Sequence, residues 1–133
     1  KIKKLYRTVD LWHSVDRKKV IEEISKYQKY SKVLIQVDMN KRSKQGGCPP
    51  ENVPDLIQLA NDKELIVEGL MTIGVDKDLE ATKNTFAGLA KLAKSMGLKE
   101  ISMGMSNDFE IAIDYGATIL RVGRSIFGER RKK

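Results

Sequence analysis

The chain has 133 residues, of which 41% are hydrophobic and 32% charged, a balance typical of one globular domain with a substantial core. No apolar run approaches the roughly 18 residues of a membrane span, and we see no secretory signal segment at the N-terminus. The net charge of +7 is not accompanied by a nucleic-acid-binding motif, so we expect neither nucleic-acid nor membrane binding. The single cysteine, Cys48, cannot form an internal disulfide, which fits a cytoplasmic protein.

The first third of the chain predicts two helices and two strands. Apolar residues at helical spacing indicate a helix over residues 1–9, and Leu11–Val15 reads as a short strand. Asp16 is the expected N-cap of a helix from Arg17 to Tyr30. The nearly continuous apolar run Val33–Met39 is typical of a parallel strand that is covered on both faces.

The middle of the chain repeats this alternation. A long polar loop from Asn40 leads to Pro50, which suits the first turn of a helix that continues to Asn61. Leu65–Gly74 is the next expected strand. A long helix then begins at Asp76 or Asp78 and runs to Met96, where Gly97 closes it.

The last third predicts a strand over Glu100–Met105, a helix over Asn107–Tyr115 and a strand over Thr118–Val122, followed by a helical turn near Ser125. Strands that alternate with helices form parallel sheets through right-handed crossovers. No glycine-rich dinucleotide motif follows the first strand. We therefore expect an α/β fold of about five parallel strands, a partial TIM-type (β/α) barrel that forms a single domain over residues 1–133.

Two strand ends predict an anion site. Ser106 and Arg124 each lie where a predicted strand ends and a predicted helix begins. Helix N-termini attract anions such as phosphate. Ser106 is also an ordinary N-cap residue, and the two roles are compatible. Gly123 permits close approach of the backbone to a ligand. Arg121 lies in an apolar strand, either at a solvent-facing edge or inside the barrel against a ligand.

Other reactive side chains give weaker signals. His13 is the only histidine and is more readily structural than catalytic. Lys44, in a polar loop, reads as a solvated lysine, because a lysine that attacks carbonyls needs burial or a cationic neighbour. Met71 is more readily a core residue than a ligand contact. Neither a metal-ligand spacing nor a nucleophile–base–acid set is visible.

The segment from Met105 to Arg130 resembles the C-terminal signature of the pyridoxal-phosphate homeostasis family, also called YggS or PROSC. Further matches are HSVD at His13, VLIQVDM at Val33, the SKQGG loop and GLMTIG at Gly69. The resemblance implies a barrel like the alanine racemase N-terminal domain that binds pyridoxal 5′-phosphate (PLP) without established turnover.

The resemblance also implies roles for individual residues. Ser106 would bond the PLP phosphate, and the backbone N–H groups of Gly123 and Arg124 would complete the cup. Arg121 would face the pyridine nitrogen, and Met71 would lie near the cofactor. No defined role carries over to His13.

The family's Schiff-base lysine lies on the first barrel strand, which has no counterpart in these residues. The expected function is therefore non-catalytic PLP binding in a truncated or engineered form that lacks this lysine. A half-barrel would leave open sheet edges and an uncovered interior, so we expect a homo-oligomer, most simply a dimer. The alternatives are a self-assembling half-barrel with a vestigial phosphate site and a racemase-like PLP enzyme.

Overall fold

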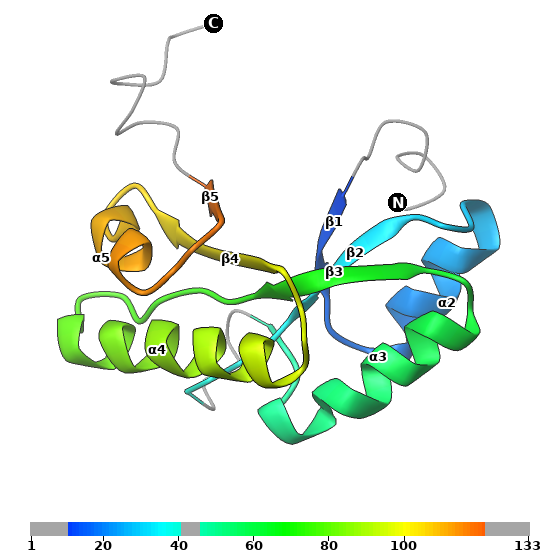
Figure 1. The fold of residues 1–133 in the computed structure, drawn as a ribbon, viewed down its shortest axis with the longest axis horizontal. Helices are drawn as coiled ribbons and strands as arrows, with labels where there is room; N and C mark the ends of the chain where they lie inside the picture. Colours follow the sequence, from blue (N-terminus) through cyan, green and yellow to red (C-terminus); the bar gives the residue numbers. More distant parts are fainter. Residues whose placement is uncertain (1–10, 41–45, 122–133) are drawn as a thin grey trace, which may run out of the picture.

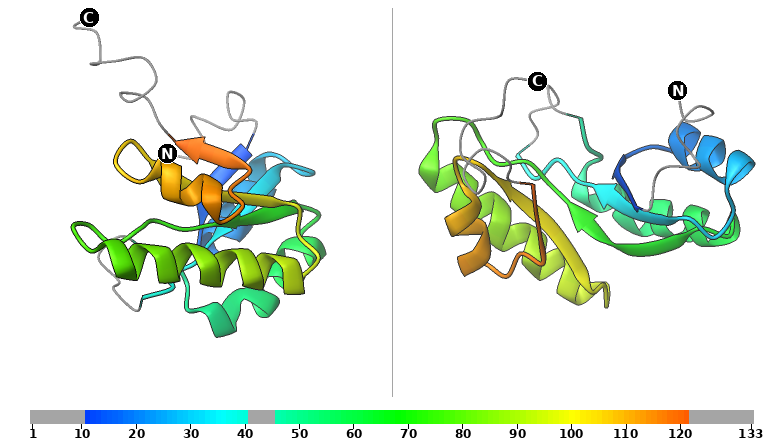
Figure 2. Two further views of the ribbon diagram at one scale, coloured as in Figure 1. Left: turned by 60° about the vertical axis from the view of Figure 1, so that its left-hand side comes forward. Right: turned by 90° about the horizontal axis from the view of Figure 1, so that it is seen from above.

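The computed structural model describes residues 11–40 and 46–121, in which five parallel strands curl into a half-barrel (Figures 1 and 2). The elements are β1 (Leu11–Val15), α2 (Lys18–Tyr27), β2 (Lys32–Gln36), the 3-10 turn η3 (Pro50–Asn52), α3 (Val53–Asp62), β3 (Ile66–Met71), α4 (Leu79–Ser95), β4 (Glu100–Met105), α5 (Phe109–Asp114) and β5 (Ile119–Arg121). The strands lie side by side in chain order, β1-β2-β3-β4-β5. This confirms the expected partial (β/α) barrel, while the expected helix over residues 1–9 and the turn near Ser125 fall outside the described residues.

The two faces of the sheet have different surroundings. Neighbouring residues of parallel strands share a face, and successive residues alternate between faces. Ile35, Leu70 and Ile101 are in register and pack with the helices in the main hydrophobic core. Gln36, Met71 and Ser102 form the next row in register, so they point to the opposite, concave face, which would be the inside of a closed barrel.

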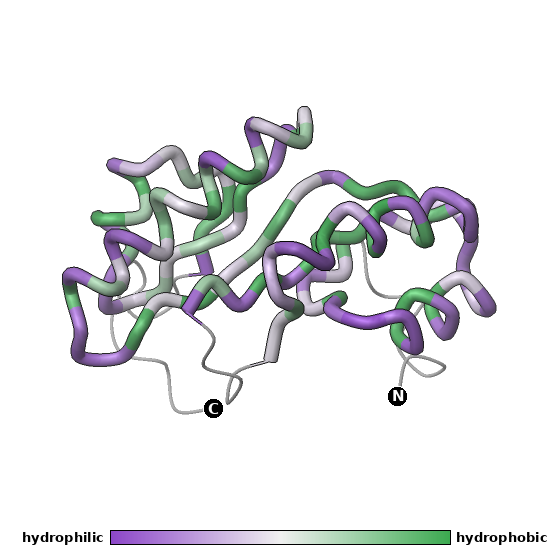
Figure 3. Tube along the Cα trace, turned by 90° about the horizontal axis from the view of Figure 1, so that it is seen from below, coloured by the Kyte–Doolittle hydropathy of each residue, from purple (hydrophilic) through white to green (hydrophobic). Residues whose placement is uncertain are grey.

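The core between sheet and helices explains why these segments become helices. Each helix buries one stripe of residues against the sheet, at the spacing of an amphipathic helix. The buried residues are Ile21 and Ile24 on α2, Val53, Leu56 and Ala60 on α3, and Thr82, Thr85, Phe86, Leu89 and Ala93 on α4. Figure 3 shows the result, with hydrophobic residues along the central strands and mixed hydropathy along the helices. Leu79, the first residue of α4, lies outside this stripe and is 58% exposed.

Two predicted helix caps are wrong and one is confirmed. Asp16 does not cap α2, whose N-cap is Arg17, because the Asp16 carboxylate instead accepts a 2.8 Å hydrogen bond from the Gly47 N–H. Ser106 does not cap α5, which begins later, with Asp108 at the N-cap position. Asp78 does cap α4, since its Oδ1 accepts from the Ala81 N–H at 3.0 Å.

Several predicted boundaries also differ from the structure. The strand expected over Val33–Met39 ends at Gln36, and the one expected over Leu65–Gly74 ends at Met71. Beyond these points the chain leaves the ladder and forms the loops at the carboxyl ends of the strands. Glu100–Met105 is a strand over the predicted range. No helix in the described ranges is both long and apolar enough to cross a membrane.

Candidate ligand site at the carboxyl ends of the strands

Arg121 is the charged residue at the centre of the candidate site. It is the last described residue of β5, and its Nη2 donates a 2.7 Å hydrogen bond to the Thr72 carbonyl oxygen beyond the end of β3. Its Nε is buried and has no hydrogen-bond partner. Burial lowers the pKa of Arg121, and the charge of Asp108 opposes that shift. Arg121 is thus partly buried although β5 is an edge strand of the described sheet, and its Nε is a donor that the described protein groups leave unused.

Thr72 ties the strand ends together around this arginine. Its Oγ1 donates to the Val37 carbonyl at 2.8 Å, and its N–H donates to the Ser102 carbonyl at 3.0 Å. Its own carbonyl accepts from Arg121. One buried residue therefore connects the chain after β2, the middle of β4 and the end of β5, and the guanidinium is anchored on a buried part of the sheet.

His13 and Ser102 meet across the concave face. His13 lies on β1 and Ser102 on β4, and the two strands are separated by β2 and β3. The Oγ of Ser102 is 3.3 Å from Nδ1 of His13. The Thr72 N–H donates to the Ser102 carbonyl and the Thr72 carbonyl accepts from Arg121, so a chain of contacts links His13 to the guanidinium. Burial and the charge of Arg121 both lower the pKa of His13. His13, Ser102 and Arg121 therefore form one polar cluster on the concave side.

Asp108 closes the other side of the cluster. Its Oδ1 accepts a 2.7 Å hydrogen bond from the Met105 N–H, which turns the chain out of β4 into α5. A Cβ added to Gly74 would lie 2.6 Å from Asp108 Oδ2, so the loop after β3 passes close to this carboxylate only because it carries glycine there. The loops after β3 and β4 are therefore held against each other.

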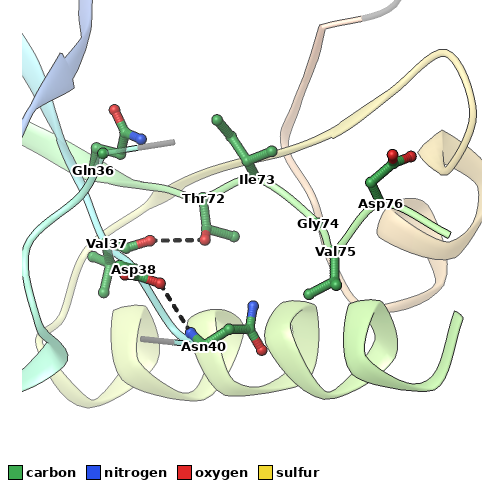
Figure 4. Close-up of a pocket in the computed structure, with 10 residues that line it drawn as sticks. Gln36, Val37, Asp38, Asn40, Thr72, Ile73, Gly74, Val75 and Asp76 are labelled. Atoms are coloured by element: carbon green, nitrogen blue, oxygen red, sulfur yellow. Dashed lines mark hydrogen bonds between the residues drawn. The ribbon is translucent and has the colours of Figure 1, made fainter. Parts of the chain in front are cut away.

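A cavity of about 310 Å³ opens at the ends of β2 and β3, next to this cluster (Figure 4). That volume lies at the lower end of the usual range for small-molecule sites. Its polar wall comes from Gln36, Asp38, Asn40, Thr72 and Asp76, and its apolar wall from Val37, Ile73 and Val75. Thr72 borders the cavity and also accepts from Arg121, so the cavity and the arginine share one wall.

The residues expected from the sequence are only partly brought together. Met71 is buried on the concave face, 4% exposed, and is not part of the core between sheet and helices. Ser106 is partly buried in the turn between β4 and α5. Gly123, Arg124 and Lys44 lie outside the described residues. Leu34, Met71 and Ser102 are buried, so at these positions the concave face is not the uncovered surface that we expected.

Sequence reasoning missed Thr72, Ser102 and Asp108. Thr72 acts largely through its backbone, and Ser102 through a partner 89 residues away, so neither leaves a local motif. A usable signal did exist, because Thr72 lies near the carboxyl end of the strand predicted over Leu65–Gly74 and Asp108 follows the one predicted over Glu100–Met105, and such ends converge in space.

The described part of the chain offers little for covalent or metal chemistry. No group of three or more potential metal ligands occurs in it. All described lysines are exposed except Lys83, which is partly buried on the outer helix α4. Burial raises the pKa of the Cys48 thiol to about 11, so this cysteine is protonated and unreactive at neutral pH. The arrangement is suited to hold a ligand through Arg121 and polar side chains.

Comparison with known proteins agrees with this architecture. Residues 1–131 match the family model of the alanine racemase N-terminal domain. The pyridoxal phosphate homeostasis protein of Aquifex aeolicus is 39% identical over 98% of this chain and 63% of its own length. The protein of the same name from Pseudomonas aeruginosa is 36% identical over 89% of this chain and 55% of its length. The chain thus spans roughly three fifths of these relatives.

Solved structures give the same picture. PipY of Synechococcus elongatus with PLP bound superposes with a TM-score of 0.79 and 30% identity, over 95% of this chain and 64% of PipY. A protein from Bifidobacterium adolescentis superposes with a TM-score of 0.85 and 32% identity, over 95% of this chain and 56% of its own. Lysine decarboxylase of Selenomonas ruminantium shares the fold, with a TM-score of 0.62 and 17% identity over 84% of this chain and 36% of its own. The chain therefore belongs to the family of the alanine racemase N-terminal domain, and its relatives there are pyridoxal phosphate homeostasis proteins.

Proposed function

We propose that this chain binds PLP at the carboxyl ends of its strands and takes part in PLP homeostasis without catalysing a reaction. Three relatives that carry this name are 34–39% identical over most of the chain, and one structural neighbour holds PLP. The reducing cytoplasm, where a free buried cysteine such as Cys48 is stable, is the proposed location.

One observation carries the proposal: the buried Nε–H of Arg121 has no hydrogen-bond partner among the described residues. A buried donor without an acceptor costs about 1–3 kcal/mol, so a ligand acceptor at this point would be favoured. The neutral nitrogen of a pyridine ring is such an acceptor. The residues therefore fit PLP at its ring nitrogen.

The same contact argues for holding PLP without turnover. When bound, PLP stabilises carbanions best if its ring nitrogen carries a proton. A guanidinium facing that nitrogen disfavours protonation, because two positive charges would lie together. Arg121 would thus keep the ring in the form that is poorest at carbanion chemistry.

The phosphate would bind on the β4–β5 side of the mouth. Ser106, in the turn after β4, would offer its hydroxyl, and the backbone N–H groups of Gly123 and Arg124 would complete the site, as the family resemblance implies. Met71 would lie beside the ring. The parallel pairing of β4 and β5 supports this arrangement, since it brings the carboxyl ends of both strands to the same edge of the sheet.

The test is a titration of the purified chain with PLP and with pyridoxamine 5′-phosphate, which has no aldehyde. We expect both to bind, because the proposed contacts go to the ring and the phosphate. Ser106→Ala should weaken both ligands, whereas Ser95→Ala, at the exposed end of α4, is the matched control and should weaken neither. Failure of both ligands to bind would refute the proposal.

Covalent attachment is tested on the same samples. After borohydride treatment and peptide mass mapping, we expect no PLP adduct on the described lysines beyond the background of surface labelling, since these lysines are exposed or lie on an outer helix. A stoichiometric adduct on one lysine, or turnover of an amino acid with PLP added, would favour the racemase-like alternative.

The edges of the sheet favour self-association as a second property. In the described residues β1 and β5 each pair with one strand only, so both have an unpaired edge. Unpaired edges are templates for pairing with another chain. We propose a homodimer, checked by sedimentation at micromolar concentration, and a stable monomer there would contradict it.

A further inference from the structure

His13 occupies a position that the proposed function leaves without a role. It is the only histidine of the chain and lies on the concave face. Its Nδ1 is 3.3 Å from Oγ of Ser102, on a strand three places away in the sheet. Ser102 is fully buried, which shields this contact from water. The imidazole is therefore braced across the curl of the half-barrel rather than free to turn.

The braced imidazole is connected to a cation through Ser102, whose carbonyl accepts from the Thr72 N–H, while the Thr72 carbonyl accepts from Arg121. Arg121 is the charged group of the described residues that acts on His13, and Asp108 is the one that acts on Arg121. Burial and the Arg121 charge both lower the pKa of His13, so the ring is neutral at neutral pH. A neutral ring is compatible with a nearby guanidinium, whereas an imidazolium would repel it.

A catalytic serine–histidine pair is a poor explanation for the same contact. The Ser102 side chain has no exposed surface, so no substrate carbonyl could reach its oxygen. In the described residues no carboxylate accepts from the His13 ring, so the third member of a triad is also missing from this part of the chain. The contact between His13 and Ser102 is therefore better suited to positioning a neighbouring group than to catalysis.

We propose that His13 is a positioning residue for Arg121: braced against Ser102, it allows the guanidinium to stay on the Thr72 carbonyl with Nε left for the ring nitrogen of the ligand. Protonation of His13 would push the guanidinium away from this anchor. The inference rests on the proposed function for its ligand, but the coupling of His13 to Arg121 does not depend on any ligand.

The first experiment therefore uses the ligand-free protein. Because the chain has one histidine, its proton NMR signals report the pKa of His13 without ambiguity. We expect Arg121→Met to raise this pKa, while burial still keeps it below 6.5. Arg17→Met, at an arginine whose side chain is 68% exposed, is the matched control and should not change it. Arg121→Gln is the second variant if the first does not fold, and an unchanged pKa in a folded variant would overturn the coupling.

The second experiment isolates the contact to the ring nitrogen. The affinity for PLP is compared with the affinity for its 1-deaza analogue, in which carbon replaces that nitrogen. Both ligands carry the phosphate, so its attraction to protonated groups contributes equally to both affinities and drops out of their ratio. On lowering the pH from 8 to 5, we expect the preference for PLP to fall further in the wild type than in His13→Gln, because only the wild type gains a second cation. Protonation of the ligand itself contributes equally to both proteins.

Two variants separate positioning from general stability. His13→Gln keeps a polar group for Ser102 and should retain the preference for PLP at pH 8. His13→Phe cannot make that contact and should lose much of the preference at pH 8. Equal weakening of PLP and the deaza analogue in His13→Phe would mean a purely structural role and would overturn the inference. If the wild type binds neither ligand, the proposed function fails, while the NMR titration still decides whether His13 and Arg121 are coupled.

Discussion

The guanidinium of Arg121 on β5 donates a 2.7 Å hydrogen bond to the carbonyl oxygen of Thr72 after β3, and so reaches past the intervening strand β4. A side chain that crosses a strand in this way is fixed at both ends. Because the guanidinium is already held in place, it loses little conformational freedom when a ligand binds. A site of this kind is called preorganised.

Replacing Arg121 tests this arrangement directly. Arg121→Leu removes the charged donor and should weaken PLP binding by about 1.5–3 kcal/mol, the usual contribution of a hydrogen bond to a charged group. Arg121→Lys should restore little of this, since an ammonium group lacks the planar fork of the guanidinium. Isothermal titration calorimetry provides the measurement. Arg17→Leu is the control on the exposed surface, and equal losses in both variants would contradict a specific role for Arg121.

The order and type of the described elements could be predicted from the sequence, because strand and helix periods alternate clearly along the chain. The strand Glu100–Met105 was bounded correctly, since turn residues flank it on both sides. The strand predicted over Val33–Met39 extends three residues too far, because the strand in the structure ends at Gln36. Its apolar run continues past Gln36, but the ladder stops there, and the length of a ladder is decided by the neighbouring strand rather than by local composition.

The sequence predicts Arg121 as a site residue, but it does not predict the hydrogen bonds that hold this residue in place. Arg121 stood out because a charge in an apolar strand needs an explanation. Its partner Thr72 did not, because any residue could supply the carbonyl that Arg121 uses. Ser106 was assigned as a cap on its residue type, but the Asp108 carboxylate takes the Met105 N–H and shifts the start of the helix.

Gly69 on β3 is a position where a side chain is excluded by the neighbouring strand. A Cβ at Gly69 would lie 1.8 Å from the Glu100 carbonyl oxygen, whereas one at Gly97 would meet nothing within 4 Å. Because the obstacle is backbone, β3 and β4 would have to separate. We expect Gly69→Ala to lower the free energy of unfolding by about 3 kcal/mol or more, measured by urea denaturation.

Gly97→Ala is the matched control for that substitution. Gly97 has a φ of +70°, so alanine there carries only the backbone strain of the left-handed region. We expect a loss of about 1 kcal/mol. A loss at Gly97 as large as that at Gly69 would mean that strand spacing is not the limiting factor at Gly69.

The N-terminus of α4 offers a choice between two aspartates that the sequence left open. Asp78 accepts from the Ala81 N–H, whereas Asp76 lies two residues earlier and is exposed. Asp78→Ala should therefore lower the free energy of unfolding by about 1 kcal/mol, the usual value of a lost cap. Asp76→Ala should have almost no effect in the same urea experiment, and the reverse order would show that the cap has been placed on the wrong residue.

His13 should also make stability depend on pH. Its pKa in the folded protein lies below the 6.5 of an unperturbed histidine, so between these two values the unfolded chain binds more protons than the folded one. The free energy of unfolding must then fall as the pH is lowered through 6.5 toward the folded-state pKa, and it recovers above 6.5, where His13 is neutral in both states.

Carboxylates also lose their charge toward the acid end of this range, but they do so equally in wild type and in His13→Gln. The difference between the urea midpoints of the two proteins, measured at pH 8, 6.5 and 5, therefore isolates the histidine. We expect the wild type to lose stability relative to His13→Gln as the pH falls, and a constant difference would mean that His13 titrates alike in the folded and unfolded chain.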